Sequence, residues 1–325
     1  QLMISGDVPV VPGFELNESG RSADILEEAR KIGFPLMVKA ASGGGGKGMR
    51  AVRDEKDLMS AIESCQREAG SSFSDSRVFV EKLIENPRHI EIQVFGDSKG
   101  NIVHLNEREC SIQRRHQKVI EEAPASFDLR DLRSQMGEVA IKAAKLVDYE
   151  GAGTVEFIYS SSGDFYFLEM NTRLQVEHPV TEMITGQDLV KEQIKVASGN
   201  KIKLKQEDIN FNGHSIECRI NAEHPETFIP SPGKITQYHQ PGGLGVRVDS
   251  AVYQGYIIPS HYDSMIAKLI VYGENRNECI QKMKRALEEY VIIGIDTNIQ
   301  LHQKIIQSSE FLSGKYDINY MSKFE

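Results

Sequence analysis

Apolar residues recur at helical spacing in parts of the first 84 residues and form short runs in others. Ile25, Ala29 and Ile32 share one helical face, and Gly70 is a stop signal for a second, longer helix. The runs between these stretches have the length and composition of strands. The patterns predict helices at 24–31 and 54–69, and strands at 36–40, 49–52 and 78–84.

After Pro87 the pattern changes to antiparallel strands joined by short turns. Strands are predicted at 89–95, 101–107, 153–160 and 165–171, with turns at 96–100 and 161–164. Helical patterns recur at 129–147, 188–197 and 277–290. This mixture predicts an α+β fold, with unit boundaries near residues 84 and 205.

The predicted hairpin at 153–171 carries an unusual row of polar side chains. Every odd position from Glu169 to Glu177 is polar, and successive side chains of an extended chain alternate between two faces. Pairing Ser160 with Phe165 fixes a register in which Glu156 lies directly opposite Glu169. The hairpin therefore presents two carboxylates to one another on one face of the sheet.

Two facing carboxylates repel each other, and a divalent cation relieves the repulsion. Glu156, Glu169 and the amide oxygen of Asn171 form an all-oxygen set that suits Mg²⁺ or Mn²⁺ beside substrate phosphates. The alternative is an ordinary hairpin with a solvated polar face.

Residues 43–48 form a glycine-rich cluster between two predicted strands. A strand follows it rather than a helix, which argues against a dinucleotide fold, and its residues do not match a phosphate-binding Walker loop. A strand–glycine loop–strand is a flap whose backbone N–H groups can close over phosphates, with Lys39 in reach of them. The alternative is a plain hairpin tip, although four consecutive glycines are entropically costly without a functional reason.

Composition narrows the class of protein. The chain has 325 residues, 40% of them hydrophobic, and a net charge of −9, which argues against a general nucleic-acid or membrane-surface binder. No apolar run is long enough to span a membrane, and the start lacks the form of a signal peptide. The four cysteines are far apart without a metal-binding spacing, which predicts packed thiols in a reducing compartment.

The flap, Lys39 and the acidic hairpin together resemble the ATP-grasp superfamily, and longer motifs resemble the biotin carboxylase family. These motifs lie at 39–50, 87–94, 113–118, 169–179, 217–223 and 262–268. The resemblance implies an ATP-grasp fold with a small α/β lid at 1–84 and a larger antiparallel catalytic subdomain at 85–205. A biotin carboxylase C-terminal subdomain would follow at 206–325.

The resemblance also implies roles for individual residues. Glu156, Glu169 and Asn171 match metal ligands. The bicarbonate pocket would comprise Arg173, Gln175 and the Val176 backbone, with Lys118 nearby. Glu177 matches the base that deprotonates bicarbonate, and Arg219 the residue that stabilises the biotin enolate. The implied contacts to ATP are Lys39, Gly45, Gly46, Glu81, Lys82, Ile84, His89, Gln113 and His116.

The implied activity is carboxylation of biotin, driven by ATP and bicarbonate through carboxyphosphate, as the first half-reaction of acetyl-CoA carboxylase. Biotin would arrive on a separate carrier protein, and a carboxyltransferase would be the second partner. The family normally begins with a further α/β domain, expected upstream of Gln1, and the full-length protein is expected to form a homodimer. The expected location is the cytoplasm, or the mitochondrial matrix for a eukaryotic acyl-CoA carboxylase.

Three other interpretations stay open. The chain could belong to a propionyl- or methylcrotonyl-CoA carboxylase, to another ATP-grasp ligase such as a carbamoyl-phosphate synthetase-like enzyme, or to a non-catalytic nucleotide-binding module. Among single residues, the pair Glu121 and Glu122 is predicted to be a charged surface, His178 to be structural and Cys218 to be a packed thiol.

Overall fold

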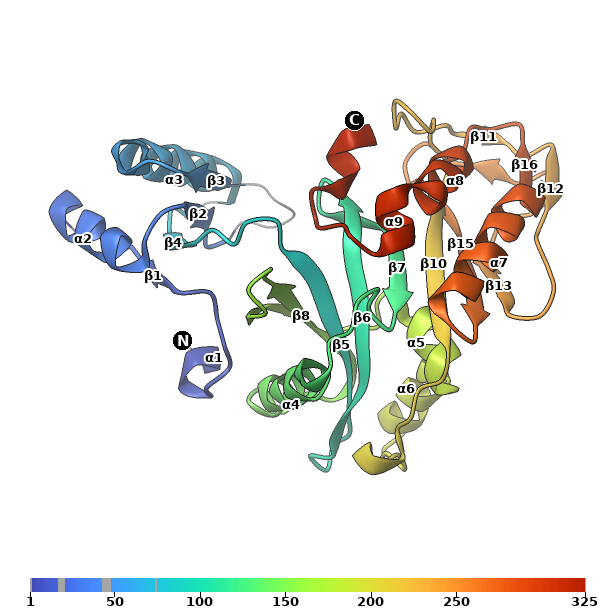
Figure 1. The fold of residues 1–325 in the computed structure, drawn as a ribbon, viewed down its shortest axis with the longest axis horizontal. Helices are drawn as coiled ribbons and strands as arrows, with labels where there is room; N and C mark the ends of the chain where they lie inside the picture. The colour runs from blue at the N-terminus through green and yellow to red at the C-terminus, as the bar shows by residue number, and fades with distance from the viewer. Residues whose placement is uncertain (1, 17–20, 43–47, 74, 325) are drawn as a thin grey trace.

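The computed structural model describes residues 2–16, 21–42, 48–73 and 75–324. Two main sheets organise the chain, one of four strands near the N-terminus and one of eight strands that forms the larger body (Figure 1). Helices and antiparallel strands are mixed, so the predicted α+β class is confirmed. The predicted ATP contacts Gly45 and Gly46 lie outside the described residues.

The N-terminal unit is a four-stranded sheet with two helices packed on it. Its strands follow the order β1-β4-β2-β3, and Leu36, Val38, Leu58 and Val80 are fully buried in its core. The predicted stop at Gly70 was wrong, since the second long helix continues to Phe73. The elements up to this point are α1 (Leu2–Ser5), β1 (Gly13–Glu15), α2 (Ser22–Ile32), β2 (Leu36–Ala40), β3 (Met49–Val52), the 3₁₀ helix Glu55–Asp57, α3 (Leu58–Phe73) and β4 (Val78–Lys82).

The eight-stranded sheet has the order β13-β15-β10-β7-β6-β5-β8-β9, and all its neighbours are antiparallel. It draws strands from both sides of residue 205, because β10 pairs with β7. Its first elements are β5 (Arg88–Gly96), β6 (Ile102–Arg114), β7 (Gln117–Ala123), α4 (Asp131–Lys145), β8 (Gly151–Tyr159), β9 (Phe165–Asn171), α5 (His178–Thr185), α6 (Leu189–Ala197) and the 3₁₀ helix Gln206–Asp208.

The remaining elements complete the sheet and cover it. They are β10 (His214–Asn221), β11 (Gly233–Lys234), β12 (Gln237–His239), β13 (Val246–Ser250), β14 (Ile257–Ile258), β15 (Met265–Gly273), α7 (Arg276–Glu289), β16 (Val291–Ile293), α8 (Ile299–Gln307), α9 (Ser309–Ser313) and the 3₁₀ helix Tyr320–Phe324. In Figure 1, α7 and α8 lie beside β10 and β15, and α4 lies beside β5.

The two faces of this sheet differ in chemistry. One face is largely apolar under α4 and α7, where residues such as Ile90, Ile216 and Val271 are fully buried, and it also buries the ion pair of Glu122 with Arg276. Because side chains alternate along a strand, the neighbours of these residues point to the opposite face. Helices α5 and α6 cover part of that second face through smaller apolar clusters, and a further set of buried charged side chains lies on the rest of it.

The β8–β9 hairpin contains a β-bulge that the predicted register lacked. Phe165 pairs with Tyr159, not with Ser160, so the predicted pairing at the turn was wrong. The register then shifts by one residue, since Phe167 pairs with Phe157 whereas Glu169 pairs with Glu156, and Leu168 is left over. The predicted opposition of Glu156 and Glu169 is therefore confirmed, through a bulge.

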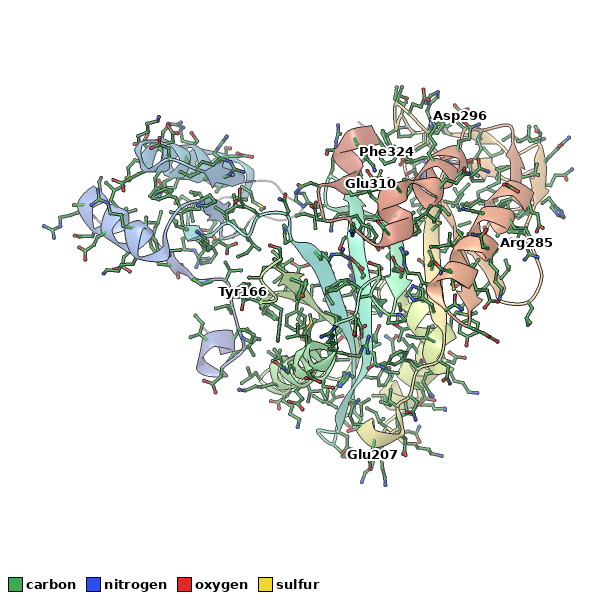
Figure 2. The ribbon with its side chains drawn as sticks, viewed as in Figure 1. Tyr166, Glu207, Arg285, Asp296, Glu310 and Phe324 are labelled. Atoms are coloured by element: carbon green, nitrogen blue, oxygen red, sulfur yellow. The ribbon has the colours of Figure 1, made fainter. Side chains whose placement is uncertain are left out.

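Strand β9 is the last strand of the sheet, and the N-terminal segment covers its edge. The backbone N–H of Phe167 donates to the carbonyl of Pro9 at 2.7 Å, and Val10 forms a bridge with Phe167. Figure 2 shows Tyr166 of this strand on the side of the sheet toward the N-terminal unit. The segment thus satisfies backbone groups that an open sheet edge would leave unpaired.

All four cysteines are free thiols and buried, which confirms that Cys65 and Cys218 are packed. Within the described ranges, none of the helices has both the length and the apolar character needed to cross a lipid bilayer.

Candidate active site

Lys118 lies at the centre of a buried cluster of carboxylates on the polar face of the large sheet. Its ammonium donates to Glu156 at 2.8 Å and to Glu177 at 2.6 Å, and it also contacts Glu91. His89 adds a ring nitrogen 3.2 Å from Glu156. Strands β5, β7 and β8 and the loop after β9 thus meet at one charged point.

The charges in this cluster stabilise one another. Burial alone would raise the pKa of Glu91, but Lys118 and the Arg108 guanidinium outweigh it and lower that pKa to about 2. Burial opposes the charge of Lys118, yet the surrounding carboxylates raise its pKa well above the usual value. For Glu156 too, His89 and Lys118 overcome burial and lower the pKa. Glu91, Glu156 and Lys118 are therefore ionised at neutral pH.

A fully buried arginine supports the cluster from behind. Arg108 donates to Glu91 at 2.5 Å through Nε and to the amide oxygen of Gln175 at 3.2 Å through Nη2. That bond orients the amide of Gln175, whose nitrogen donates to Glu156 at 3.0 Å. Three further acceptors, Gln93, Thr154 and Thr181, satisfy the rest of the guanidinium. Arg108 therefore fixes the positions of groups that line the site.

Arg219 on β10 reaches the same cluster from the C-terminal part of the chain. Its Nη2 donates to Glu177 at 2.9 Å and its Nε donates to Glu121 at 2.5 Å. Glu121 and Glu122 are both buried, so the prediction of a charged surface pair was wrong. The local pattern missed this because β10 and α7 supply the partners, Arg219 for Glu121 and Arg276 for Glu122.

The acidic hairpin offers hard oxygen ligands beside this cluster. Glu169 is exposed and lies opposite Glu156, and Asn171 donates to Glu169 at 3.3 Å through its amide nitrogen. Turning that amide over would present its oxygen to a cation between the two carboxylates. Arg173 is also exposed, and its Nη2 donates to Asn171 at 3.4 Å.

Two groups of side chains in the described part of the chain bring possible ligand atoms within 4.8 Å of one another. They are His89, Glu91 and Glu156, and Glu91, Cys110 and Glu177. Lys118 contacts carboxylates of both groups, and burial raises the pKa of the Cys110 thiol well above its usual value. Mg²⁺ prefers oxygen ligands, which favours Glu156, Glu169 and Asn171 as candidate ligands over either of these groups.

Two of the predicted ATP contacts of the N-terminal unit form an ion pair. Lys39 on β2 pairs with Glu81 on β4, and both side chains are about one-fifth exposed. Lys82 donates 2.9 Å hydrogen bonds to the carbonyls of Gly33 and Phe34, so its side chain links β4 to the segment between α2 and β2.

The predicted contact Gln113 lies near the end of β6, and His116 lies in the turn between β6 and β7. His116 is exposed in this turn, and both it and Arg115 have positive φ angles of 64° and 49°, which non-glycine residues rarely adopt. Gln113 lies 3.5 Å from His89. The turn thus exposes an imidazole two residues before Lys118, in a backbone conformation of a kind that concentrates at functional sites.

Known families match both parts of the chain. A profile described as the carbamoyl-phosphate synthase L chain ATP-binding domain matches residues 1–205, and one described as the biotin carboxylase C-terminal domain matches residues 217–323. A biotin carboxylase from Campylobacter jejuni, solved as a β,γ-ATP complex, has 52% sequence identity and a TM-score of 0.92 over 99% of this chain and 72% of its own. This chain belongs to the biotin carboxylase family.

Two further relatives of the family are informative. A pyruvate carboxylase subunit of Methanothermobacter thermautotrophicus is 55% identical over all of this chain and 66% of its own length. The biotin carboxylase domain of Hydrogenobacter thermophilus 2-oxoglutarate carboxylase, solved as a dimer with MgADP, ADP and bicarbonate, has a TM-score of 0.90 at 46% identity. The match between the two covers 72% of the Hydrogenobacter chain and all of this chain. The chain thus spans about two-thirds to three-quarters of the length of these relatives.

Sequence reasoning missed three supporting residues of this biotin carboxylase site. Glu91 could have been found, because it alternates with His89 and Gln93 on one strand face. Arg108 had no such signal, since its partners lie on four other segments. Lys268 on β15 donates to the Val176 carbonyl at 2.8 Å and so holds the loop that carries Gln175 and Glu177.

Proposed function

We propose that this chain carries out the ATP- and bicarbonate-dependent carboxylation of biotin held on a carrier protein. The observation that carries the proposal is the position of Glu177, buried between Lys118 and Arg219 beside the oriented amide of Gln175. A carboxylate there can take the proton of bicarbonate, and the fixed cationic and amide donors can hold the anion. The names of the relatives support the same activity.

In the proposed reaction, Glu177 removes the proton from bicarbonate and an oxygen of the anion attacks the γ-phosphorus of ATP. The bond from that phosphorus to the bridging oxygen breaks, which yields carboxyphosphate and ADP. Bound Mg²⁺ would neutralise phosphate charge, and Glu156, Glu169 and Asn171 would hold it. Carboxyphosphate then splits into CO₂ and phosphate, the phosphate removes the proton of the ureido nitrogen of biotin, and that nitrogen attacks CO₂. Arg219 would face the ureido oxygen that gains charge in this step.

The acceptor of the carboxyl group lies beyond this half-reaction. Acetyl-CoA is our proposed acceptor, with a biotin carrier and a carboxyltransferase as partners and a homodimer as the assembly, as seen in the Hydrogenobacter domain. Pyruvate is the second candidate, because one relative at 55% identity is named as part of a pyruvate carboxylase. The division into units at residues 84 and 205 and the cytoplasmic location also stay proposals.

The decisive test measures ADP release by the full-length protein with MgATP, with and without bicarbonate and biotin. Biotin carboxylation predicts release that needs bicarbonate and rises with biotin. Release that ignores biotin and requires an amino donor would indicate another ATP-grasp ligase. Tight ATP binding without turnover would indicate a non-catalytic module. Holoenzyme assays with acetyl-CoA and with pyruvate then identify the acceptor.

Replacing Glu177 by glutamine tests the base directly. Glu177→Gln keeps the size of the side chain but removes its capacity to accept a proton, so carboxylation should slow by about 10²–10⁴-fold. ATP binding, measured by calorimetry, should change less than about twofold because no nucleotide contact is assigned to Glu177. An equal loss of binding and turnover would assign Glu177 a structural role.

A further inference from the structure

The guanidinium of Arg219 is held on two edges by two different carboxylates. Nη2 faces Glu177 at 2.9 Å, and Nε faces Glu121 at 2.5 Å. Glu177 belongs to the proposed reaction, whereas Glu121 lies on β7 and is fully buried. Glu121 thus binds the edge of Arg219 that does not face Glu177.

The backbone of Arg219 is fixed as well. Its carbonyl accepts hydrogen bonds from Asn298 at 2.9 Å and from His302 at 2.7 Å, both on or next to α8. With the main chain held from one side and Nε held from the other, few rotamers of the side chain remain. This matters because a displacement of about 1 Å at a reacting group can cost about 10²-fold in rate.

A second buried carboxylate lies next to Glu121 and provides an internal comparison. Glu217 is the direct cross-strand partner of Glu121 and is fully buried. Within the described residues, neither of its oxygens has a hydrogen-bond donor. An ionised carboxylate without a donor is very costly in a protein interior, so Glu217 is a neutral acid. Burial and the nearby Glu121 raise its pKa well above the usual value, which agrees.

We propose that Glu121 is a positioning residue that anchors Nε of Arg219 and so aims the other edge of the guanidinium at the reacting centre. Without this anchor, Arg219 is free to turn both of its forked donors onto Glu177, the only other carboxylate it contacts in the described chain. Such a turn would misplace Arg219 and hold the proposed base in a tighter ion pair. This inference rests on the proposed function.

The first test is a double-mutant cycle in the full-length protein, assayed at about pH 8, because burial raises the pKa of Glu121 to about 7 although Arg219 opposes the shift. Glu121→Gln should lower kcat for biotin carboxylation by about 10- to 100-fold and change KM for ATP less than about twofold. In an Arg219→Ala background the same substitution should cost less than about twofold. Equal losses in both backgrounds would overturn the proposal.

Glu217→Gln is the matched control, because glutamine resembles the neutral acid that already occupies this position. It should keep kcat within about twofold, and a loss as large as that of Glu121→Gln would refute a specific anchor. Glu121→Asp guards against a variant that fails to fold. Aspartate keeps the charge, but its shorter side chain moves the carboxylate away from Nε of Arg219. We therefore expect kcat to fall while the melting temperature stays near that of the natural protein.

Crystal structures of the Glu121→Gln and natural proteins separate this inference from the proposed function. The anchor predicts that the Arg219 guanidinium leaves its place or becomes disordered in the variant, and an unchanged guanidinium would overturn it. If the natural protein does not carboxylate biotin, the proposed function fails, and the crystal structures still decide whether Glu121 positions Arg219.

Discussion

At the scale of single residues, the site depends on balanced buried charge. Glu91, Glu156 and Glu177 surround Lys118, and Arg108 and Arg219 add two more cations. Removing one partner of a buried ion pair leaves the other uncompensated, which costs far more than losing an exposed pair. Substitutions in this cluster should therefore affect stability as well as activity.

Arg108→Lys tests the supporting role of the buried guanidinium. Lysine keeps the charge but lacks the planar fork that contacts Glu91, Gln93 and Gln175, so the free energy of unfolding should fall by about 3 kcal/mol. Urea denaturation followed by circular dichroism measures the change. Arg130→Lys, which alters an exposed pair with Asp128, is the control and should leave the midpoint unchanged. Equal midpoint shifts would contradict the role of Arg108.

Glu169→Gln tests the metal site on the hairpin. The amide is a weaker ligand than the carboxylate, so the affinity for nucleotide in the presence of Mg²⁺ should fall about tenfold or more. Titrating nucleotide binding against Mg²⁺ measures the effect. Glu207→Gln, at an exposed position far from the hairpin, is the control. An unchanged Mg²⁺ dependence would count against a metal between Glu156 and Glu169.

At the scale of elements, β-bulges decide which side chains reach the site. Phe167 shares a face with Phe157 in the apolar core, and the extra residue Leu168 turns Glu169 to the opposite face, beside Glu156. Strand β7 also contains a β-bulge. Ile120 pairs with Ile112 but Lys118 pairs with Gln113, so Val119 is the extra, unpaired residue. Bulges commonly redirect side chains in this way next to active sites.

Helix α8 ties the C-terminal part to β10 through a histidine that must stay neutral. His302 donates through Nε2 to the Arg219 carbonyl, and its Nδ1 has no partner among the described residues. Burial lowers the pKa of His302 to about 4, although the bond to Arg219 opposes the shift. Because the unfolded histidine binds its proton near pH 6.5, His302 stabilises the fold above that pH.

The stabilisation by His302 should be lost as the pH falls from about 6.5 through about 4, by about 3 kcal/mol in total. Denaturant unfolding at a series of pH values measures it. His302→Gln keeps an N–H donor but does not titrate, so the difference in stability between the two proteins should shrink across this range. A difference that is independent of pH would contradict the buried neutral imidazole.

At the scale of the whole molecule, one sheet joins the two parts that different family profiles match. Strand β10 pairs with β7 from Ser215 opposite Ala123 to Cys218 opposite Ile120, so the chain after residue 205 completes the sheet begun before it. Arg219 and Arg276 from the later part neutralise Glu121 and Glu122 from the earlier one. The proposed site is therefore assembled from both parts.

A chain ending at residue 205 should not form a stable soluble unit. The cut exposes the edge of β7 and leaves Glu121 and Glu122 without their arginine partners. We expect aggregation on size-exclusion chromatography and no cooperative thermal transition, whereas residues 1–325 should give both a single peak and a transition. A soluble, cooperatively folding fragment would show that the sheet tolerates division at this point.

Much of the fold could be predicted locally. The bounds of β2 and β3 agree with the predicted runs, because each run is short, mostly apolar and bounded by residues typical of turns. The long helix was predicted four residues too early, since residues 55–57 form a 3₁₀ turn and the helix runs from Leu58 through Gly70 to Phe73, at the cost that a glycine carries in a helix. The tie between Arg108 and Gln175 spans 67 residues of sequence, and no local pattern reports a contact of that length.

The sequence by itself determined the family and the chemistry that is available, because its motifs name the carboxylates, amides and cations in order. It also predicted a hairpin that brings Glu156 and Glu169 opposite each other, although the turn pairs one residue differently and the bulge at Leu168 restores this opposition. Only the tertiary structure decided that Glu121 and Glu122 are buried and that the bulges at Leu168 and Val119 turn charged side chains toward the site. Burial and pairing across distant strands depend on the whole packed sheet, so no local stretch of sequence contains them.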